Sequence, residues 1–392
     1  MSAIGSAPGR SEDQEIKRIT LSALNFADEL LAWGTNLANG GQADTYIRFV
    51  TSPGTLSLVF RSKHRNTKML FDLVILLACI SLSHAATYNL SRSWSGSDFY
   101  DDFTFRTFDD PTHGRVNYVD LNTARNNNLS FASGDTFVMR ADSSHVVTPS
   151  ARGRDSVRIH SKETFSDGVL VLDVTHMPVG CGTWPAFWTC TPGSWPVGGE
   201  IDIIEGVNGI GTNLASLHTP SGCTMPTTGR IMTGNYTGND CLGENNSGCG
   251  VSDGRVRSFG QSFNDGQGGY FVMRRSAARG IATWFWPRLD PSIPHDISTP
   301  TSPSIYESMW STPWANFPST PNMCDMTNTN IMSPHEIIFD LTFCGDWAGN
   351  VWYGSGCEGQ ANWSCNDWVD QNPTAFTNAY WEIKGLRWYE EA

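Results

Sequence analysis

Short segments in which apolar and polar residues alternate recur after residue 86, and they constrain the fold more than any other feature of the chain. Alternation with a period of two is typical of half-buried β-strands. Clusters of Gly, Pro, Asn and Asp separate the segments, and no long 3.6-residue periodicity competes with them. We therefore predict an all-β fold, an antiparallel β-sandwich. Its expected strands include Ser156–Ser161, Val169–Val174, Tyr270–Arg274, Ile281–Trp286, Ile337–Phe343 and Tyr380–Tyr389.

Two stretches of the chain lack this alternation. Pro291–Pro321 is rich in Pro and Ser, and Cys223–Cys249 is rich in Cys, Gly and Asn. Both are predicted to be long surface loops. Because there is neither an internal repeat nor a low-complexity linker, one domain is expected to cover residues 86–392.

A segment that resembles a secretory signal peptide lies well inside the chain. Residues 69–85 contain an apolar run from Leu73 to Leu82, preceded by basic residues and followed by small residues suited to cleavage. We predict a signal peptide over 69–85 and a mature protein that begins at Ala86. Residues 1–68, with one possible amphipathic helix near Glu15–Leu37, are then an upstream extension outside the mature protein. A type II membrane anchor is the alternative, disfavoured because the apolar run is short.

Composition also indicates a secreted protein. Nine of the ten cysteines follow residue 180 and none forms a C-x-x-C pair, which favours disulfides over zinc. Once Cys79 is removed with the signal, one cysteine is left as a free thiol or pairs with another chain. N-x-[S/T] sequons agree, at Asn89, Asn128, Asn235, Asn245 and Asn362. A net charge of −13 disfavours nucleic acid as a partner, whereas fifteen Trp suit a neutral, hydroxyl-rich ligand. We expect a monomer that needs no cofactor and has no catalytic metal.

The segment G-E-I-D-I-I-E-G places three carboxylates within six residues of strand-like sequence. On a regular strand Glu200 and Asp202 share a face and Glu205 is out of phase, so a one-residue β-bulge is needed to return Glu205 to the same face. The alternative without catalytic function is a solvated acidic edge strand, which would have polar neighbours. Here Ile residues surround the acids and Trp residues precede them. Paired carboxylates are the groups that cleave glycosidic bonds, and neighbours on one face suit a retaining mechanism.

The segment from Trp184 to Asn208, W-P-A-F-W-T-C-T-P-G-S-W-P-V-G-G-E-I-D-I-I-E-G-V-N, resembles the active-site signature of glycoside hydrolase family 16, and in particular the secreted fungal endo-1,3(4)-β-glucanases. The similarity extends over the mature chain, through G-R-V-N-Y-V-D at Gly114 and L-T-F-C-G-D-W-A-G at Leu341. It implies a jelly-roll, concanavalin A-like sandwich with a concave cleft for β-1,3- or mixed β-1,3/1,4-glucan. It also implies that Glu200 is the nucleophile, Asp202 the assisting carboxylate and Glu205 the general acid/base.

Other residues are expected to bind the glucan. Flat indole rings stack on sugars, and the candidate platforms are Trp184, Trp188, Trp195 and Trp347. His218 is expected near the cleft, with a purely structural role as the alternative. Polar candidates for contacts with sugar hydroxyls are Asn117, Tyr118 and Arg158, of which Arg158 is equally suited to an ion pair within the sheet.

Three other functions are alternatives to hydrolysis of the glucan. A transglycosylase that remodels wall glucan would use the same acids, with a second sugar in place of water. A catalytically inactive lectin on the same sandwich would be expected to lack one acid, and all three are present. A structural wall protein would have no need of acids surrounded by Trp.

Overall fold

The computed structural model describes residues 17–21, 45–52, 55–62, 86–244, 248–358 and 363–392. By internal contacts the chain separates into two compact units, Met1–His84 and Ala85–Ala392. In the first unit, β1 (Lys17–Leu21), β3 (Thr55–Ser62) and β2 (Thr45–Ser52) form an antiparallel sheet. The helix expected near Glu15–Leu37 is therefore wrong over Lys17–Leu21. The signal-like residues 69–85 lie outside the described residues, so their cleavage stays a prediction.

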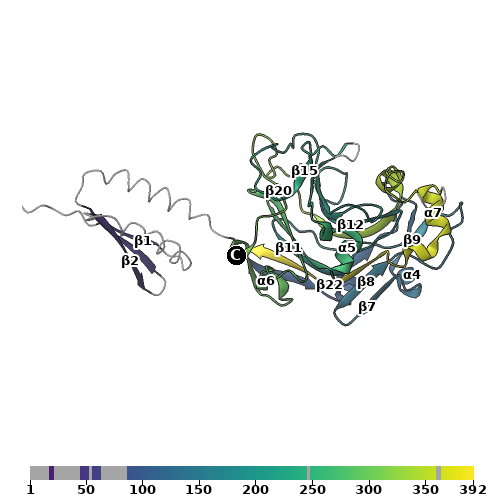
Figure 1. Cartoon of the computed structure of the whole chain (residues 1–392), viewed down its shortest axis with the longest axis horizontal. Helices are drawn as coiled ribbons and strands as arrows, with labels where there is room; N and C mark the ends of the chain where they lie inside the picture. Colours follow the sequence, from purple (N-terminus) through teal and green to yellow (C-terminus); the bar gives the residue numbers. More distant parts are fainter. Residues whose placement is uncertain (1–16, 22–44, 53–54, 63–85, 245–247, 359–362) are drawn as a thin grey trace, which may run out of the picture. The chain divides into compact units, whose positions relative to one another are not determined.

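The second unit is built around two antiparallel sheets (Figure 1). We call the first the cleft sheet, and its strands in spatial order are β15 (Asn235–Gly238), β16 (Cys249–Ser252), β14 (Leu214–His218), β13 (Glu200–Glu205), β12 (Thr183–Cys190), β21 (Glu336–Phe343), β10 (Arg158–Ser161) and β5 (Phe103–Phe105).

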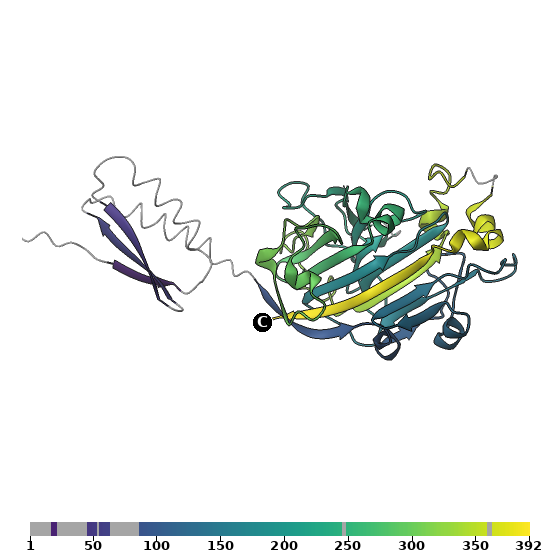
Figure 2. The same cartoon turned by 60° about the horizontal axis from the view of Figure 1, so that its bottom comes forward.

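The second sheet, called the opposing sheet, has the spatial order β19 (Ser304–Tyr306), β4 (Thr87–Trp94), β22 (Tyr380–Glu391), β11 (Gly168–His176), β17 (Gly269–Ser276), β18 (Gly280–Pro287) and β20 (Ala315–Phe317). A hairpin of β7 (Ser130–Ser133) and β8 (Thr136–Arg140) also joins it through β22. Figure 2 shows β22 as the long yellow strand that runs along this sheet to the C-terminus. The predicted sandwich is confirmed.

Short elements connect the sheets. A parallel pair is formed by β6 (Val116–Tyr118) and β9 (Arg154–Ser156). The helices are α3 (Asp98–Asp102), α4 (Leu121–Asn126), α5 (Gly260–Asp265), α6 (His295–Ser298) and α7 (Cys365–Gln371), with single turns η2 (Val256–Ser258), η3 (Glu307–Met309), η4 (Gly345–Gly349) and η5 (Pro373–Phe376). None of the helices in the described part of the chain has the length and apolarity needed to cross a bilayer.

The core lies between the two sheets. It is formed largely by every second side chain along the strands, because side chains alternate between the two faces of a sheet. Phe187 on β12 and Phe339 on β21 are buried and stack with their ring centroids 4.4 Å apart. They belong to one apolar cluster with residues of the opposing sheet such as Leu172 and Phe271. Since alternate residues point to opposite faces, their neighbours along β12 and β21 must point away from this core.

The two stretches expected to be loops contain secondary structure. Pro291–Pro321 includes α6, β19, η3 and β20, and Ile297 and Ile305 from it pack with Val171 and Trp284 on the outer face of the opposing sheet. That sheet is therefore buried on both faces. The stretch Cys223–Cys249 contains β15 and is tied by the disulfides Cys223–Cys324 and Cys241–Cys249. Pro- and Cys-rich composition obscured these short strands.

The other two disulfides are Cys181–Cys357 and Cys344–Cys365. Among the described cysteines Cys190 alone has no disulfide partner within the chain, so it is the odd cysteine. The sequon residues Asn89, Asn128 and Asn235 are exposed, whereas Asn245 and Asn362 lie outside the described residues.

Candidate active site

The outward-facing residues of the cleft sheet line a cleft of about 1170 Å³. On β12 the even-numbered positions Trp184, Ala186, Trp188 and Cys190 line it, and on β21 Glu336, Ile338, Asp340 and Thr342 do. The register pairs these two series directly, from Trp184 with Thr342 to Cys190 with Glu336. The alternation that places Phe187 and Phe339 in the core thus forms the cleft on the other face.

The three carboxylates of β13 reach this cleft through a bulge. Along β12, Cys190 pairs with Glu200 and Trp188 with Asp202, but Phe187 pairs with Ile204, so Ile203 has no partner of its own. The pairing with β14 shifts at the same place. Ile203 and Ile204 are consequently both buried in the core, and Glu205 returns to the face of Glu200 and Asp202. The bulge predicted from the spacing is confirmed.

The turn before β13 requires glycine. Gly199 has a φ of +87°, and a Cβ there would lie 2.6 Å from the carbonyl oxygen of Ile331. Behind it the buried His335 bridges Thr189 Oγ1 and the carbonyl oxygen of Gly198, each at 2.9 Å. Burial lowers the pKa of His335 to about 3, so this ring remains neutral. The backbone conformation of Gly199 and the hydrogen bonds of His335 together fix the turn that places Glu200 in the cleft.

Each glutamate accepts a hydrogen bond from the indole of one tryptophan. Trp195 Nε1 donates to Glu200 Oε2 and Trp184 Nε1 donates to Glu205 Oε1, both at 2.9 Å. The Trp195 side chain is 40% exposed, whereas Trp184 is buried and packs edge-to-face on Trp347 with centroids 5.7 Å apart. Trp195 therefore presents a free surface to the cleft, and Trp184 serves mainly to orient Glu205.

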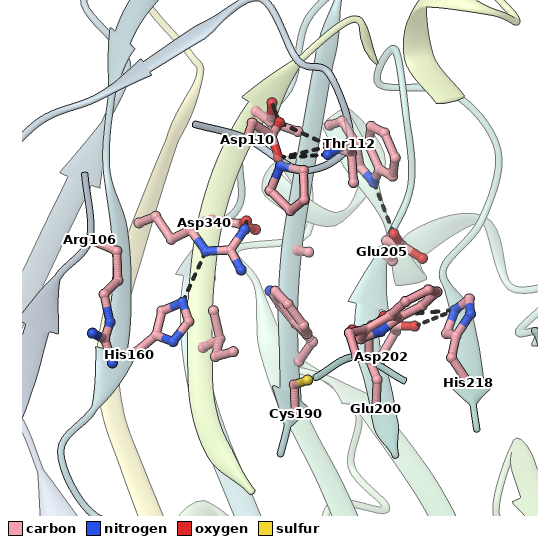
Figure 3. Close-up of a pocket in the computed structure, with 18 of the residues that line it drawn as sticks. Arg106, Asp110, Thr112, His160, Cys190, Glu200, Asp202, Glu205, His218 and Asp340 are labelled. Carbon is pink, nitrogen blue, oxygen red and sulfur yellow. Dashed lines mark hydrogen bonds and ion pairs between the residues drawn. The ribbon is translucent and has the colours of Figure 1, made fainter. Parts of the chain in front are cut away.

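Asp202 lies between the two glutamates along β13, and His218 lies beside Glu200 and Asp202 on the neighbouring strand β14, as Figure 3 shows. His218 Nε2 is 3.2 Å from Asp202 Oδ2 and 3.9 Å from Glu200 Oε1. Of the described residues, these three form the one group whose donor atoms are close enough to share a metal ion. His218 thus belongs to the cleft, as the sequence predicted.

Burial is the main electrostatic influence on the acids. It raises the pKa of Glu200, Asp202 and Glu205, and the charge of Asp202 raises the pKa of both glutamates further. The indole N–H of Trp195 and that of Trp184 act in the opposite direction, each lowering the pKa of its own glutamate. Such a trio keeps a proton at neutral pH and can divide an ionised carboxylate from a protonated one.

The far side of the cleft carries a second polar group, of which the sequence predicted only Arg158 as a site residue (Figure 3). Arg158 pairs with Asp340 at 3.1 Å and donates from Nε to His160 Nε2 at 2.9 Å, and His160 Nδ1 lies 2.7 Å from Glu336. The guanidinium of Arg158 also covers one face of Trp188, 4.9 Å from the ring centroid. Arg158 is therefore an ion-pair partner in the sheet, and Trp188 has only one face available to a sugar.

Two of the predicted polar contacts are corrected by the structure. Asn117 and Tyr118 do not line the cleft. Asn117 donates to Asp155 at 2.6 Å, and the buried Tyr118 hydroxyl donates to Asp340 at 3.3 Å. Both act behind the cleft wall because the short strand β6 pairs with β9 and lies outside the cleft sheet. Trp184, Trp188, Trp195 and Trp347 all line the cleft.

Known proteins match this chain both in sequence and in structure. Residues 103–389 match the family described as the XgeA-like, catalytic GH16 domain. An endo-1,3(4)-β-glucanase of Arthroderma benhamiae is 37% identical over 325 residues, which span 81% of this chain and 68% of that protein.

Two solved structures are similar over the whole of their own chains. Laminarinase 16A of Phanerochaete chrysosporium, solved with β-glucans in both donor and acceptor sites, is 47% identical, with a TM-score of 0.74 over 78% of this chain. An elongating GH family 16 β-1,3-glucosyltransferase is 38% identical, with a TM-score of 0.70 over 77% of this chain.

Proposed function

Since the chain belongs to glycoside hydrolase family 16, among its XgeA-like catalytic domains, we propose that it is a secreted endo-glucanase that cleaves β-1,3- or mixed β-1,3/1,4-glucan with retention. The observation that carries the proposal is the row of Glu200, Asp202 and Glu205 on one face of β13, inside a cleft lined with Trp. The cleft lies on an open sheet face, which suits attack within a long polymer.

The proposed first step is attack by Glu200 on the anomeric carbon. Trp195 holds one oxygen of Glu200, so the other is the nucleophile. Glu205 gives its proton to the departing glycosidic oxygen, and a covalent glycosyl-enzyme forms with inversion. In the second step Glu205, now ionised, takes a proton from water as that water attacks the same carbon. Glu200 leaves, and two inversions return the β-configuration.

Asp202 is proposed to assist by keeping the two glutamates in different protonation states. It lies between them, and its charge raises the pKa of each. When Glu200 is ionised, the negative charges of Glu200 and Asp202 both favour a protonated Glu205. The first step requires this combination of an ionised Glu200 and a protonated Glu205.

Stereochemistry separates the two glutamates experimentally. In a Glu200→Gly variant azide can enter the vacated space and attack the anomeric carbon once, which gives an α-glycosyl azide. In a Glu205→Gly variant, given a substrate with a good leaving group, the glycosyl-enzyme forms and azide then displaces Glu200, which gives a β-glycosyl azide. Anomeric coupling constants in NMR spectra distinguish the products. Exchanged configurations would exchange the roles, and near-wild-type hydrolysis in either variant would contradict the proposal.

Transglycosylation is the second candidate, favoured by the similarity to a glucosyltransferase of the same family. It uses the same glycosyl-enzyme and differs in whether water or a sugar hydroxyl attacks it. Chromatography of products from laminarin, lichenan and xyloglucan, with and without an acceptor oligosaccharide, separates the two. Products longer than the acceptor at low acceptor concentration would favour transfer.

A further inference from the structure

Three side chains on the same face of β13 and β14 direct donor atoms to one point in the cleft. Glu200 and His218 are direct cross-strand partners, and Asp202 is two residues further along the same face. One donor atom from each lies within 4.8 Å of the other two. Neighbouring antiparallel strands thus present two carboxylate oxygens and one imidazole nitrogen together.

His218 makes ion-pair contacts with both carboxylates of this group, but no hydrogen bond joins them. Among the described residues Asp202 Oδ2 has no hydrogen-bond partner, although its side chain is 96% buried. His218 Nε2 is only 3.2 Å away, but the two atoms do not have hydrogen-bond geometry. A buried carboxylate oxygen that accepts no hydrogen bond is costly unless a cation lies against it.

Distances identify the kind of cation. Zinc binds imidazole nitrogen and carboxylate oxygen at about 2.0–2.2 Å in a tetrahedral arrangement, so two of its ligands lie roughly 3.3–3.4 Å apart. The 3.2 Å between His218 and Asp202 already fits, and the 3.9 Å between His218 and Glu200 must close by about half an ångström. Calcium and magnesium prefer ligand sets made only of oxygen, so the imidazole disfavours them.

We propose that Glu200 Oε1, Asp202 Oδ2 and His218 Nε2 form an inhibitory site for Zn²⁺. Two carboxylates and a neutral imidazole balance the charge of a divalent ion. Trp195 holds Glu200 Oε2, so the oxygen left for the ion is also the one left to attack a sugar. Bound zinc and productive glucan binding are therefore mutually exclusive. The site itself stands on geometry alone, and only its effect on activity rests on the proposed function.

The cleft offers two alternative sets of zinc ligands, the thiol of Cys190 and the pair of His160 with Glu336. Cys190 is the cross-strand partner of Glu200 on β12, and its thiol would be a sulfur ligand. His160 is paired with Glu336, but Arg158 donates to His160 and Arg106 binds the same Glu336, so two guanidinium groups repel a cation there. Variants at Cys190 and His160 are accordingly the matched controls.

Equilibrium dialysis of the full chain against Zn²⁺ tests the site without any enzymatic reaction. We expect one tight ion per chain, and binding weaker by at least about tenfold in His218→Ala, in the less disruptive His218→Gln and in the isosteric Asp202→Asn. Cys190→Ser and His160→Ala should bind as the wild type does. A circular dichroism spectrum of each variant checks that it is folded.

X-ray absorption of the zinc-loaded protein should show ligands only at about 2.0–2.2 Å and none at about 2.3 Å, the Zn–S distance. In glucan hydrolysis zinc should raise KM without changing kcat, whereas Ca²⁺ and Mg²⁺ at equal concentration should do neither. Absence of zinc binding, equal binding by folded His218 variants, or loss of binding in Cys190→Ser would overturn the site. A lack of hydrolysis with intact zinc binding would instead refute the proposed function alone.

Discussion

Replacing Trp184 with Phe should move one limb of the pH–activity profile and leave the other in place. The change keeps an aromatic ring in the buried position beside Trp347 and removes the N–H that donates to Glu205 Oε1 at 2.9 Å. That N–H stabilises the ionised form of Glu205 more than the protonated form. Its loss must therefore raise the pKa of Glu205.

The size of the shift follows from the energies of the two hydrogen bonds. A hydrogen bond to a charged group contributes about 1.5–3 kcal/mol, and one to a neutral group about 0.5–1.5 kcal/mol. The difference is roughly 1–1.5 kcal/mol, which at about 1.36 kcal/mol per unit corresponds to a rise of about one pKa unit. Glu205 must be protonated to act as the acid, so the alkaline limb of kcat/KM should move up by about one pH unit.

The acidic limb should not move, because it reports ionisation of Glu200, whose hydrogen bond from Trp195 is intact. The assay is kcat/KM for a soluble laminarin oligosaccharide between about pH 3 and 10, a range that brackets the raised carboxyl pKa values. Trp347→Phe is the matched control, since it alters the same aromatic contact and leaves the Trp184–Glu205 hydrogen bond. An unmoved alkaline limb would refute the role of the N–H, and a shifted acidic limb would exchange the roles of the two glutamates.

Three further predictions follow. Burial raises the pKa of Glu205 to about 8, so the wild type loses folding stability as the pH rises from about 4.5 to 8. Glu205→Gln should remove this loss. Thermal melts should show a gain in unfolding free energy that is small near pH 4 and reaches about 1–3 kcal/mol above pH 8. Trp188→Ala should weaken glucan binding by about 1–3 kcal/mol in calorimetry, and unchanged affinity with a large fall in melting temperature would make it a packing residue. N-terminal sequencing of secreted protein should begin at Ala86, and recovery of a full-length membrane-bound chain would contradict this.

The parts of the site that are local in sequence were predictable. E-I-D-I-I-E lies within one strand, so the period of two and the need for a bulge before Glu205 follow from the spacing of the acids. The same alternation in I-I-F-D-L-T-F would have placed Asp340 on the face opposite to Phe339. What the sequence could not supply was the strand order that makes β21 the neighbour of β12 and brings Asp340 into the same cleft.

Contacts between distant segments account for the errors. The segment G-R-V-N-Y-V-D resembles the family, but only the parallel pairing of β6 with β9 shows that Asn117 faces Asp155 instead of the cleft. The short strands β19 and β20 within Pro291–Pro321 exist because they pair with β4 and β18. Three-residue strands carry too little periodicity to be recognised before their partners are known.

Ionised buried acids lower the stability of the folded protein, and disulfides near the cleft act in the opposite direction. Each carboxyl pKa raised above its unfolded value means that ionising the group destabilises the folded state, by about 1.36 kcal/mol per unit. The disulfides Cys181–Cys357 and Cys344–Cys365 tie the chain just before Trp184 to the segment that carries Trp347, and a disulfide contributes typically about 2–4 kcal/mol. They act at the end of the cleft where Trp347 supports Trp184, and through it Glu205. The links thus offset the cost of ionising the buried acids while holding the tryptophan that orients one of them.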